Sequence, residues 1–420
     1  MRKSFSLLAE TELLVLTNVD ILGETLAETE MLEVREVDSL GEILVETKLL
    51  PIRDVDKLRG ILAETDILLL RDVDTLGEIL AETELLALTD MDRLGEILSE
   101  TELLALRDLD RLEEILPEIE LIALREIDRL ETVLSETELL ALRDVDRLGK
   151  ILVETDMLLL KAVDTLAKIL SDTELLVLSV IDRLEEILAE TDMLLLEDVD
   201  TLAEILSDTE LLELSDIDKL GEILLETDML PLMDVDTLTE ILSDTESLEL
   251  SDIDRLGEIL VETELLLLKD VDTLSEMLLD AELLELSDID RLGEVAVETE
   301  LLLLKDVDTL AEILSDRELI VLSDIDRLEE ILVETELLLL KDVDVDTVRE
   351  ILSETELLLL RDIERLGGVL VETELLLLKD VNTFAETLSD TELLELSDID
   401  RLGEILVETE LLLLKDVDNL

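Results

Sequence analysis

The stretch Asp252–Lys269, DIDRLGEILVETELLLLK, is one copy of an 18-residue repeat that fills the chain. The next copy, Asp270–Ser287, reads DVDTLSEMLLDAELLELS, so the shared pattern is D-[VI]-D-x-L-x-E-I-L-x-[ED]-T-E-L-L-x-L-x. With Asp252 counted as position 1, apolar residues return at the same positions in copy after copy. A fixed period of this kind is typical of a solenoid, in which stacked repeats bury one continuous core.

The repeats form a single array over residues 1–420. About 22 complete copies run from residue 18 to residue 415, with partial copies at 1–17 and 416–420. Near 342–346 the run DVDVD inserts two residues, after which the step of 18 resumes. A chain of this length usually forms two or three domains, but here the number of repeats sets the length.

The end of each repeat has the pattern of a β-strand. Position 17 is Leu, Ile or Val in every copy, whereas position 16 accepts Glu and Pro, as at Glu285 and Pro231. An α-helix would place position 16 on its apolar face and position 17 toward its polar side, which is the reverse of this tolerance. Strands alternate with a period of two. We therefore expect about four extended residues per repeat, paired between repeats in a continuous parallel sheet.

The beginning of each repeat keeps helical spacing, with apolar residues at positions 2, 5, 8 and 9. Gly occupies position 6 in ten copies, including Gly257, and costs about 1 kcal/mol inside a helix. Pro117 at position 10 would break a longer helix. These observations predict a short helix-like arc before the strand, and hence an α/β solenoid.

Two other folds remain open. An all-β solenoid accommodates apolar residues six apart, at positions 2, 8 and 14, about as naturally in 18 residues. An α-solenoid of 36-residue helical hairpins would explain why two kinds of repeat alternate from about Asp144 onward. Copies ending in Lys there alternate with copies ending in Ser.

The repeats contain the stretch V-x-x-L-G-x-x-[IL]-L-x-x-T, followed by L-L-x-L. This stretch resembles the leucine-rich repeat. It is most similar to the variety found in bacterial surface proteins, and is carried here by Val73, Leu76, Gly77, Ile79, Leu80 and Thr83. The resemblance implies protein binding on a strand-lined concave face, which positions 16 and 18 would form. This repeat departs from the family in being shorter than its usual 20–29 residues and in lacking the Asn ladder.

Charge excludes several partners. The chain has 115 acidic and 33 basic residues, a net charge of −82, which argues against nucleic acid and against an anionic membrane surface. Because 48% of residues are hydrophobic and recur at fixed positions, we expect a folded and soluble chain. No signal peptide is evident and no apolar run reaches the roughly 18 residues of a membrane span. The sequence does not indicate a compartment.

No catalytic constellation is visible, since the chain has no His, no Cys and no phosphate-binding loop. The strongest candidates for ligand binding are the D-x-D pairs, whose stacked carboxylates would bind Ca²⁺. Representative pairs are Asp252 and Asp254, Asp288 and Asp290, and Asp398 and Asp400. The other interpretation is that these aspartates cap the helical turn that follows. Thr at position 12 is expected to form a buried hydroxyl ladder.

The sequence therefore predicts a non-enzymatic scaffold or protein-interaction solenoid with a strongly acidic surface and no cofactor. Its partner would be another protein or a second copy, bound through the strand-lined face. Outward leucines at position 16, such as Leu267, Leu303 and Leu339, would form the binding patch. One alternative is a Ca²⁺-binding acidic repeat array. Another is an expanded low-complexity repeat without a selected function.

Overall fold

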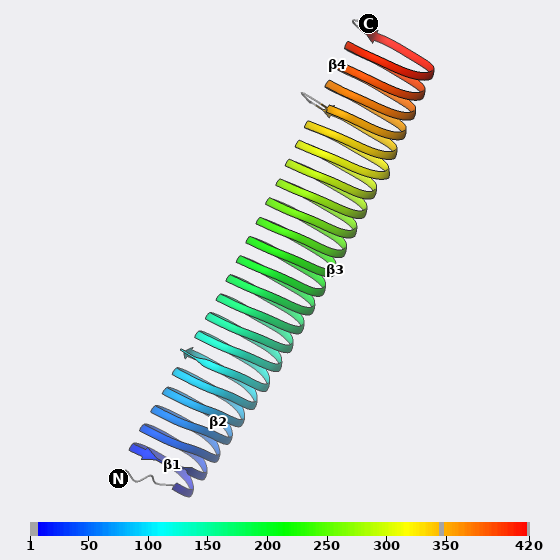
Figure 1. Cartoon of the computed structure of the whole chain (residues 1–420). Helices are drawn as coiled ribbons and strands as arrows, with labels where there is room; N and C mark the ends of the chain where they lie inside the picture. The colour runs from blue at the N-terminus through cyan, green and yellow to red at the C-terminus, as the bar shows by residue number, and fades with distance from the viewer. Residues whose placement is uncertain (1–6, 344–347, 418–420) are drawn as a thin grey trace. The chain divides into compact units, whose positions relative to one another are not determined.

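The computed structural model describes residues 7–343 and 348–417, and almost all of them belong to β-strands that wind as coils (Figure 1). The strands are β1 (Leu7–Leu22), β2 (Thr25–Leu109), β3 (Leu112–Val343) and β4 (Val348–Val417). They pair in parallel in the order β1-β2-β3-β4. The chain divides into two compact units, Met1–Glu210 and Leu211–Leu420, and the same coil is found in both.

Each coil pairs with the next through residues at equal positions of successive repeats. In the first unit Leu14 lies opposite Leu32, and Leu104 lies opposite Ile122, an offset of 18 residues in each case. In the second unit Leu338 of β3 lies opposite Leu358 of β4, an offset of 20 residues. The two additional residues of the DVDVD run therefore fall between β3 and β4, and they leave the pairing on either side in register.

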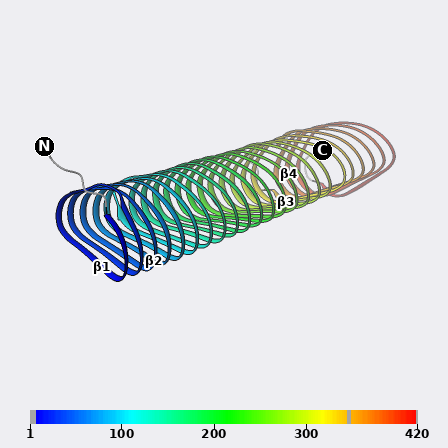
Figure 2. The same ribbon diagram turned by 90° about the horizontal axis from the view of Figure 1, so that it is seen from below.

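The core consists of aliphatic side chains inside each coil. Figure 2 shows the outline of the coils that enclose them. Positions 2, 5, 8, 10, 12, 15 and 17 point inward, and in the reference repeat these are the buried residues Ile253, Leu256, Ile259, Val261, Thr263, Leu266 and Leu268. Inward and outward residues alternate over positions 8–12 and 15–17. Two adjacent residues face outward at positions 3–4, 6–7, 13–14 and 18–1, and these pairs mark the corners of the coil.

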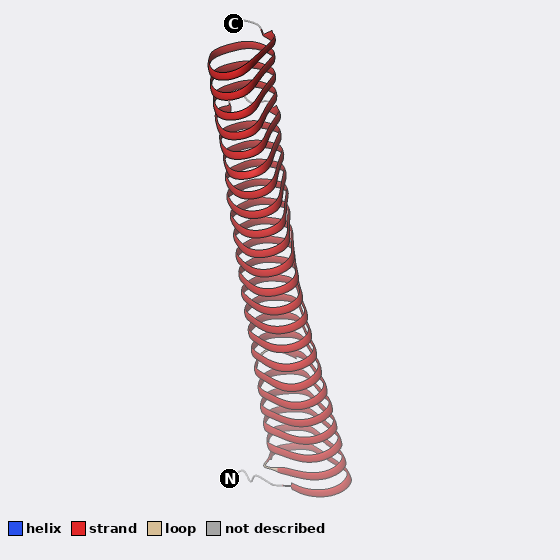
Figure 3. Cartoon of the chain, turned by 90° about the vertical axis from the view of Figure 1, so that its right-hand side faces the viewer, coloured by secondary structure: helices blue, strands red, loops and turns tan. Residues whose placement is uncertain are grey.

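The predicted helix-like arc is wrong, because the described residues contain no helix (Figure 3). Consequently no helix long and apolar enough to span a membrane is found among them. The solenoid and its parallel sheet are confirmed, in the all-β form. Inward residues at positions 2, 5 and 8 are three apart because a corner separates each pair, and this spacing imitates one turn of a helix. The helical-hairpin alternative fails for the same reason.

One corner of each coil is formed by a residue in the left-handed region. Asp252 at position 1 has φ 55°, and the equivalent residue of every coil from Asn18 to Asp416 has a similar positive φ. Asp and Asn adopt this conformation more readily than most other residues, because their short polar side chains bond locally. The aspartates at position 1 therefore turn the chain and do not cap a helix, which corrects that interpretation.

Gly at position 6 allows two coils to approach closely. A Cβ added to Gly257 would collide with the backbone carbonyl oxygen of Thr239, one coil earlier. Pro117, expected to interrupt a helix, instead lies in strand β3 and pairs with Ser99 of β2. The residues that argued against a long helix are thus accommodated in a coil made only of strand.

Position 12 forms the predicted buried hydroxyl ladder in part. The Thr263 hydroxyl accepts a hydrogen bond from the Thr245 hydroxyl at 3.4 Å, and it lies 3.1 Å from the carbonyl oxygen of Leu265, to which it donates. Other buried hydroxyls in the same column, such as that of Thr47, have no hydrogen-bond partner among the described atoms. The column is therefore held together chiefly by packing.

Candidate functional site

The D-x-D pairs lie on the outer surface, with position 1 at one corner of the coil and position 3 at the next. In each pair the intervening residue, for example Ile253, points into the core, so both carboxylates face outward. The six candidates occupy position 1 or position 3 and are all exposed: Asp252, Asp254, Asp288, Asp290, Asp398 and Asp400. Within residues 7–343 and 348–417, no three acidic side chains gather closely enough to hold a metal ion.

Basic residues at position 18 partly neutralise the column of aspartates at position 1. The Lys269 ammonium lies 3.0 Å from the Asp270 carboxylate. The hydrogen bond and charge of Asp270 raise the pKa of Lys269, and Asp252 and Asp288 in the neighbouring coils add to this shift. Lys305 repeats the contact with Asp306 at 2.7 Å. The chain thus offsets its own acidic column at this corner.

Repulsion within the same column is visible at Glu126. A hydrogen bond that the protonated Glu126 carboxyl donates to the Asp108 carboxylate, one coil earlier, raises the pKa of Glu126, and burial and the charge of Asp108 act in the same direction. Arg107 and Arg125 oppose the shift. Carboxylates stacked at a spacing of about 4.8 Å therefore interact unfavourably unless cations stand beside them.

The predicted leucine patch at position 16 is only half-exposed. Leu267, Leu303 and Leu339 point outward from the extended segment at positions 15–17 of the repeat, as predicted, but each is half-buried. In neighbouring copies the same position holds exposed acids at Glu249 and Glu285, but a half-buried Val321 between Leu303 and Leu339. Acids therefore interrupt the apolar residues at this position in only part of the array.

A second column of leucines, at position 9, lies on the outside of the coil. Helical spacing groups these residues with positions 2, 5 and 8, but the structure places them outward, between the inward positions 8 and 10. Leu260 and Leu278 are 41% and 44% exposed. Position 9 is Leu in every complete copy except at Ala296. The sequence contains one signal of the outward direction of position 9. Positions 8, 10 and 12 alternate with positions 9 and 11, as in a strand, and position 10 accepts both Ser and Val.

Repeat duplication alone does not explain this uniformity. Position 4, which also faces outward, changes from Arg255 to Thr273 in adjacent copies. Position 16 is Leu267 in one copy and Glu285 in the next. An outward position that stays apolar while other outward positions vary is a candidate contact surface.

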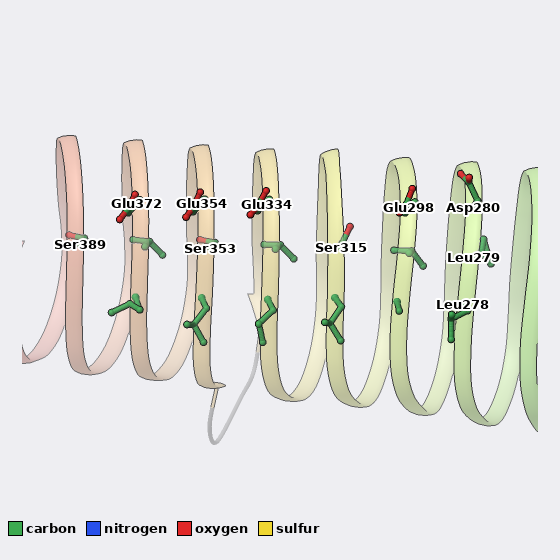
Figure 4. Close-up of a pocket in the computed structure, with 18 of the residues that line it drawn as sticks. Leu278, Leu279, Asp280, Glu298, Ser315, Glu334, Ser353, Glu354, Glu372 and Ser389 are labelled. Atoms are coloured by element: carbon green, nitrogen blue, oxygen red, sulfur yellow. The ribbon is translucent and has the colours of Figure 1, made fainter.

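The leucine column borders an acidic column at position 11, and together they form a groove. In the second unit this groove extends from Leu242 to Glu408 and has a volume of about 1750 Å³. Figure 4 shows the carboxylates of Glu334, Glu354 and Glu372 in one row over successive coils. A shorter groove of about 590 Å³ has the same composition in the first unit, between Leu152 and Asp208.

Comparison of the chain with known protein families, with curated proteins and with solved structures finds no match. The resemblance to leucine-rich repeats therefore stays a prediction. The surface described above has to be interpreted from its own chemistry.

Proposed function

We propose that the protein is a non-enzymatic scaffold that binds other proteins through a repeated outer surface. The observation that supports this function is the column of outward, partly exposed leucines at position 9, bordered by acids at position 11. Apolar side chains supply contact area, and a rim of charge selects partners and steers their approach. Because the surface repeats with every coil, one chain offers many equivalent binding positions.

Self-association through the same surface is the weaker proposal. Two copies meeting there would bring two columns of carboxylates together, since Glu262 and Asp280 and their equivalents border the leucines throughout. Like charges facing each other across an interface cost several kcal/mol. A partner with an opposite or neutral surface avoids this cost.

A photo-crosslinking experiment tests the proposed function. A photoreactive residue replaces Leu278 in the groove of the full chain, and a matched chain carries it at Met233, which is 45% exposed outside the groove. We expect protein adducts from the Leu278 position that unmodified chain competes away, and none of that kind from Met233. Equal labelling from both positions, or labelling that unmodified chain does not reduce, would refute the proposed function.

A further inference from the structure

The groove of the second unit has three parallel rows. The outer rows are the leucines of position 9 and the acids of position 11, and the residues of position 10, such as Val261 and Ser353, lie between them. Among the described residues, nine coils contribute an Asp or Glu to the groove, from Asp244 to Glu408. Figure 4 shows Leu278 in the apolar row and Asp280 in the acidic row of the same coil.

The charged side chains described in this groove are all negative. Positions 7–13 of the repeats that line it contain no Lys or Arg apart from Arg317, whose side chain lies outside the described residues. The basic residues instead stand at other positions of the coil, as in the pairs Lys269–Asp270 and Lys341–Asp342. A surface with unbalanced negative charge attracts cations and repels other anions. The occupant that fits is therefore cationic as well as apolar.

The spacing of the leucines indicates the conformation of the occupant. Neighbouring coils of a parallel sheet lie about 4.7–4.9 Å apart, and one turn of an α-helix advances about 5.4 Å. The mismatch of about 0.6 Å per turn reaches half a coil spacing only after about four turns, or roughly 14 residues. An extended strand presents same-side residues about 6.7 Å apart, so its mismatch is about 1.9 Å after two residues and exceeds half a coil spacing by the fourth residue.

We propose that this groove binds a cationic amphipathic α-helix of another protein, laid along the stack of coils. Its apolar residues contact the position 9 leucines once per turn, and its Lys or Arg side chains reach the carboxylates of position 11. The inference rests on the proposed function and adds the chemistry and the shape of the partner. A second copy of this chain is disfavoured as occupant by its net charge of −82.

Binding of a labelled synthetic peptide to the full chain tests the inference. The probe is an 18-residue Leu/Lys helix with one apolar stripe, a length of about five turns, followed by fluorescence anisotropy. A peptide of the same composition without the stripe, and a striped peptide broken by a central Pro, serve as controls. We expect the intact helix to bind at least about 10-fold more tightly than either control.

Two chain variants locate the contact. Leu260→Gln with Leu278→Gln alters the groove, and Met229→Gln with Met233→Gln alters residues that are 52% and 45% exposed elsewhere in the second unit. Circular dichroism confirms that both variants fold. The groove variant is expected to weaken binding about 10-fold, and the control variant less than about 2-fold.

Equal binding of all three peptides, or equal weakening by both variants, overturns the inference, because either result indicates attraction by charge alone. Sedimentation that shows a dimer lost only in the groove variant overturns it in favour of a second copy. The crosslinking experiment separates this failure from failure of the proposed function. If adducts from Leu278 are specific but the helical probe does not bind, the proposed scaffold function is supported and the proposed helical partner is wrong.

Discussion

Replacing Val180 by Asn is expected to stabilise the coil to which it belongs. Val180 occupies position 1 with φ 57°, where a left-handed conformation costs an L-residue about 1–2 kcal/mol and a β-branched side chain is especially unfavourable. Asn18 adopts the same conformation elsewhere in the chain. Because the Val180 side chain is 43% exposed, the loss of apolar burial offsets only part of this gain. We expect a net stabilisation of about 1 kcal/mol.

Hydrogen exchange of the backbone amides around residue 180 is the appropriate assay. Repeat arrays open locally, so a single unfolding transition of the whole chain would dilute the effect of one coil. A stabilisation of about 1 kcal/mol slows exchange through local opening about 5-fold. Amides several coils away should exchange at their original rate.

Val177→Asn is the matched control, since it places the same substitution three residues earlier in the same strand. Val177 is half-buried at position 16 and extended, where Val is favoured and Asn is disfavoured. Exchange nearby should therefore become faster. If Val180→Asn also accelerates exchange, or leaves it unchanged, the left-handed corner does not carry the cost assigned to it.

Three further substitutions test packing, hydrogen bonding and charge. Gly257→Ala should lower local stability by about 1–3 kcal/mol through backbone collision, measured by hydrogen exchange of the surrounding amides. Gly60→Ala, whose new Cβ would lie 3.6 Å from its nearest neighbour, should not; similar losses would contradict the close approach. In the same assay Thr263→Val should cost about 1 kcal/mol, while Thr47→Val should be neutral or stabilising, and the opposite order would argue against the hydroxyl geometry. Glu126→Gln should increase the protection of the amides around residue 126 at pH 7, because a carboxyl whose folded pKa is raised above its ordinary 4.5 is unfavourable only while ionised. That gain should vanish as the pH falls below 4.5, and a pH-independent gain would rule out relief of repulsion.

The strand at the end of each repeat was predictable because one position decides it. Leu268 and its equivalents at position 17 never become polar, while their outward neighbours at position 16 do. Only alternate burial explains that contrast. The hydroxyl ladder at position 12 was predictable for a similar reason, since a small polar residue that returns in nearly every copy of an aliphatic core needs a partner or a tight space.

The helix-like arc was mispredicted because local spacing does not distinguish a helical turn from a corner. Ile253, Leu256 and Ile259 are three residues apart in either case, and the corners at positions 3–4 and 6–7 form only when neighbouring coils pair. The direction of Leu260 depends on the same pairing. The acids at position 11 were visible in the sequence. That they lie beside an outward column of leucines could be seen only once the coil was closed.

The two-residue offset between β3 and β4 has a consequence for how the native alignment is selected. Wherever the step is 18, a coil that skipped its neighbour and paired with the next but one would meet an almost identical row of side chains. In such a misaligned state one repeat is extruded as a loop and loses its core contacts, while the remaining coils pair almost as well as in the native state. The irregular positions, such as Pro51, Pro231 and the offset itself, act as landmarks that distinguish one alignment from its many near-copies.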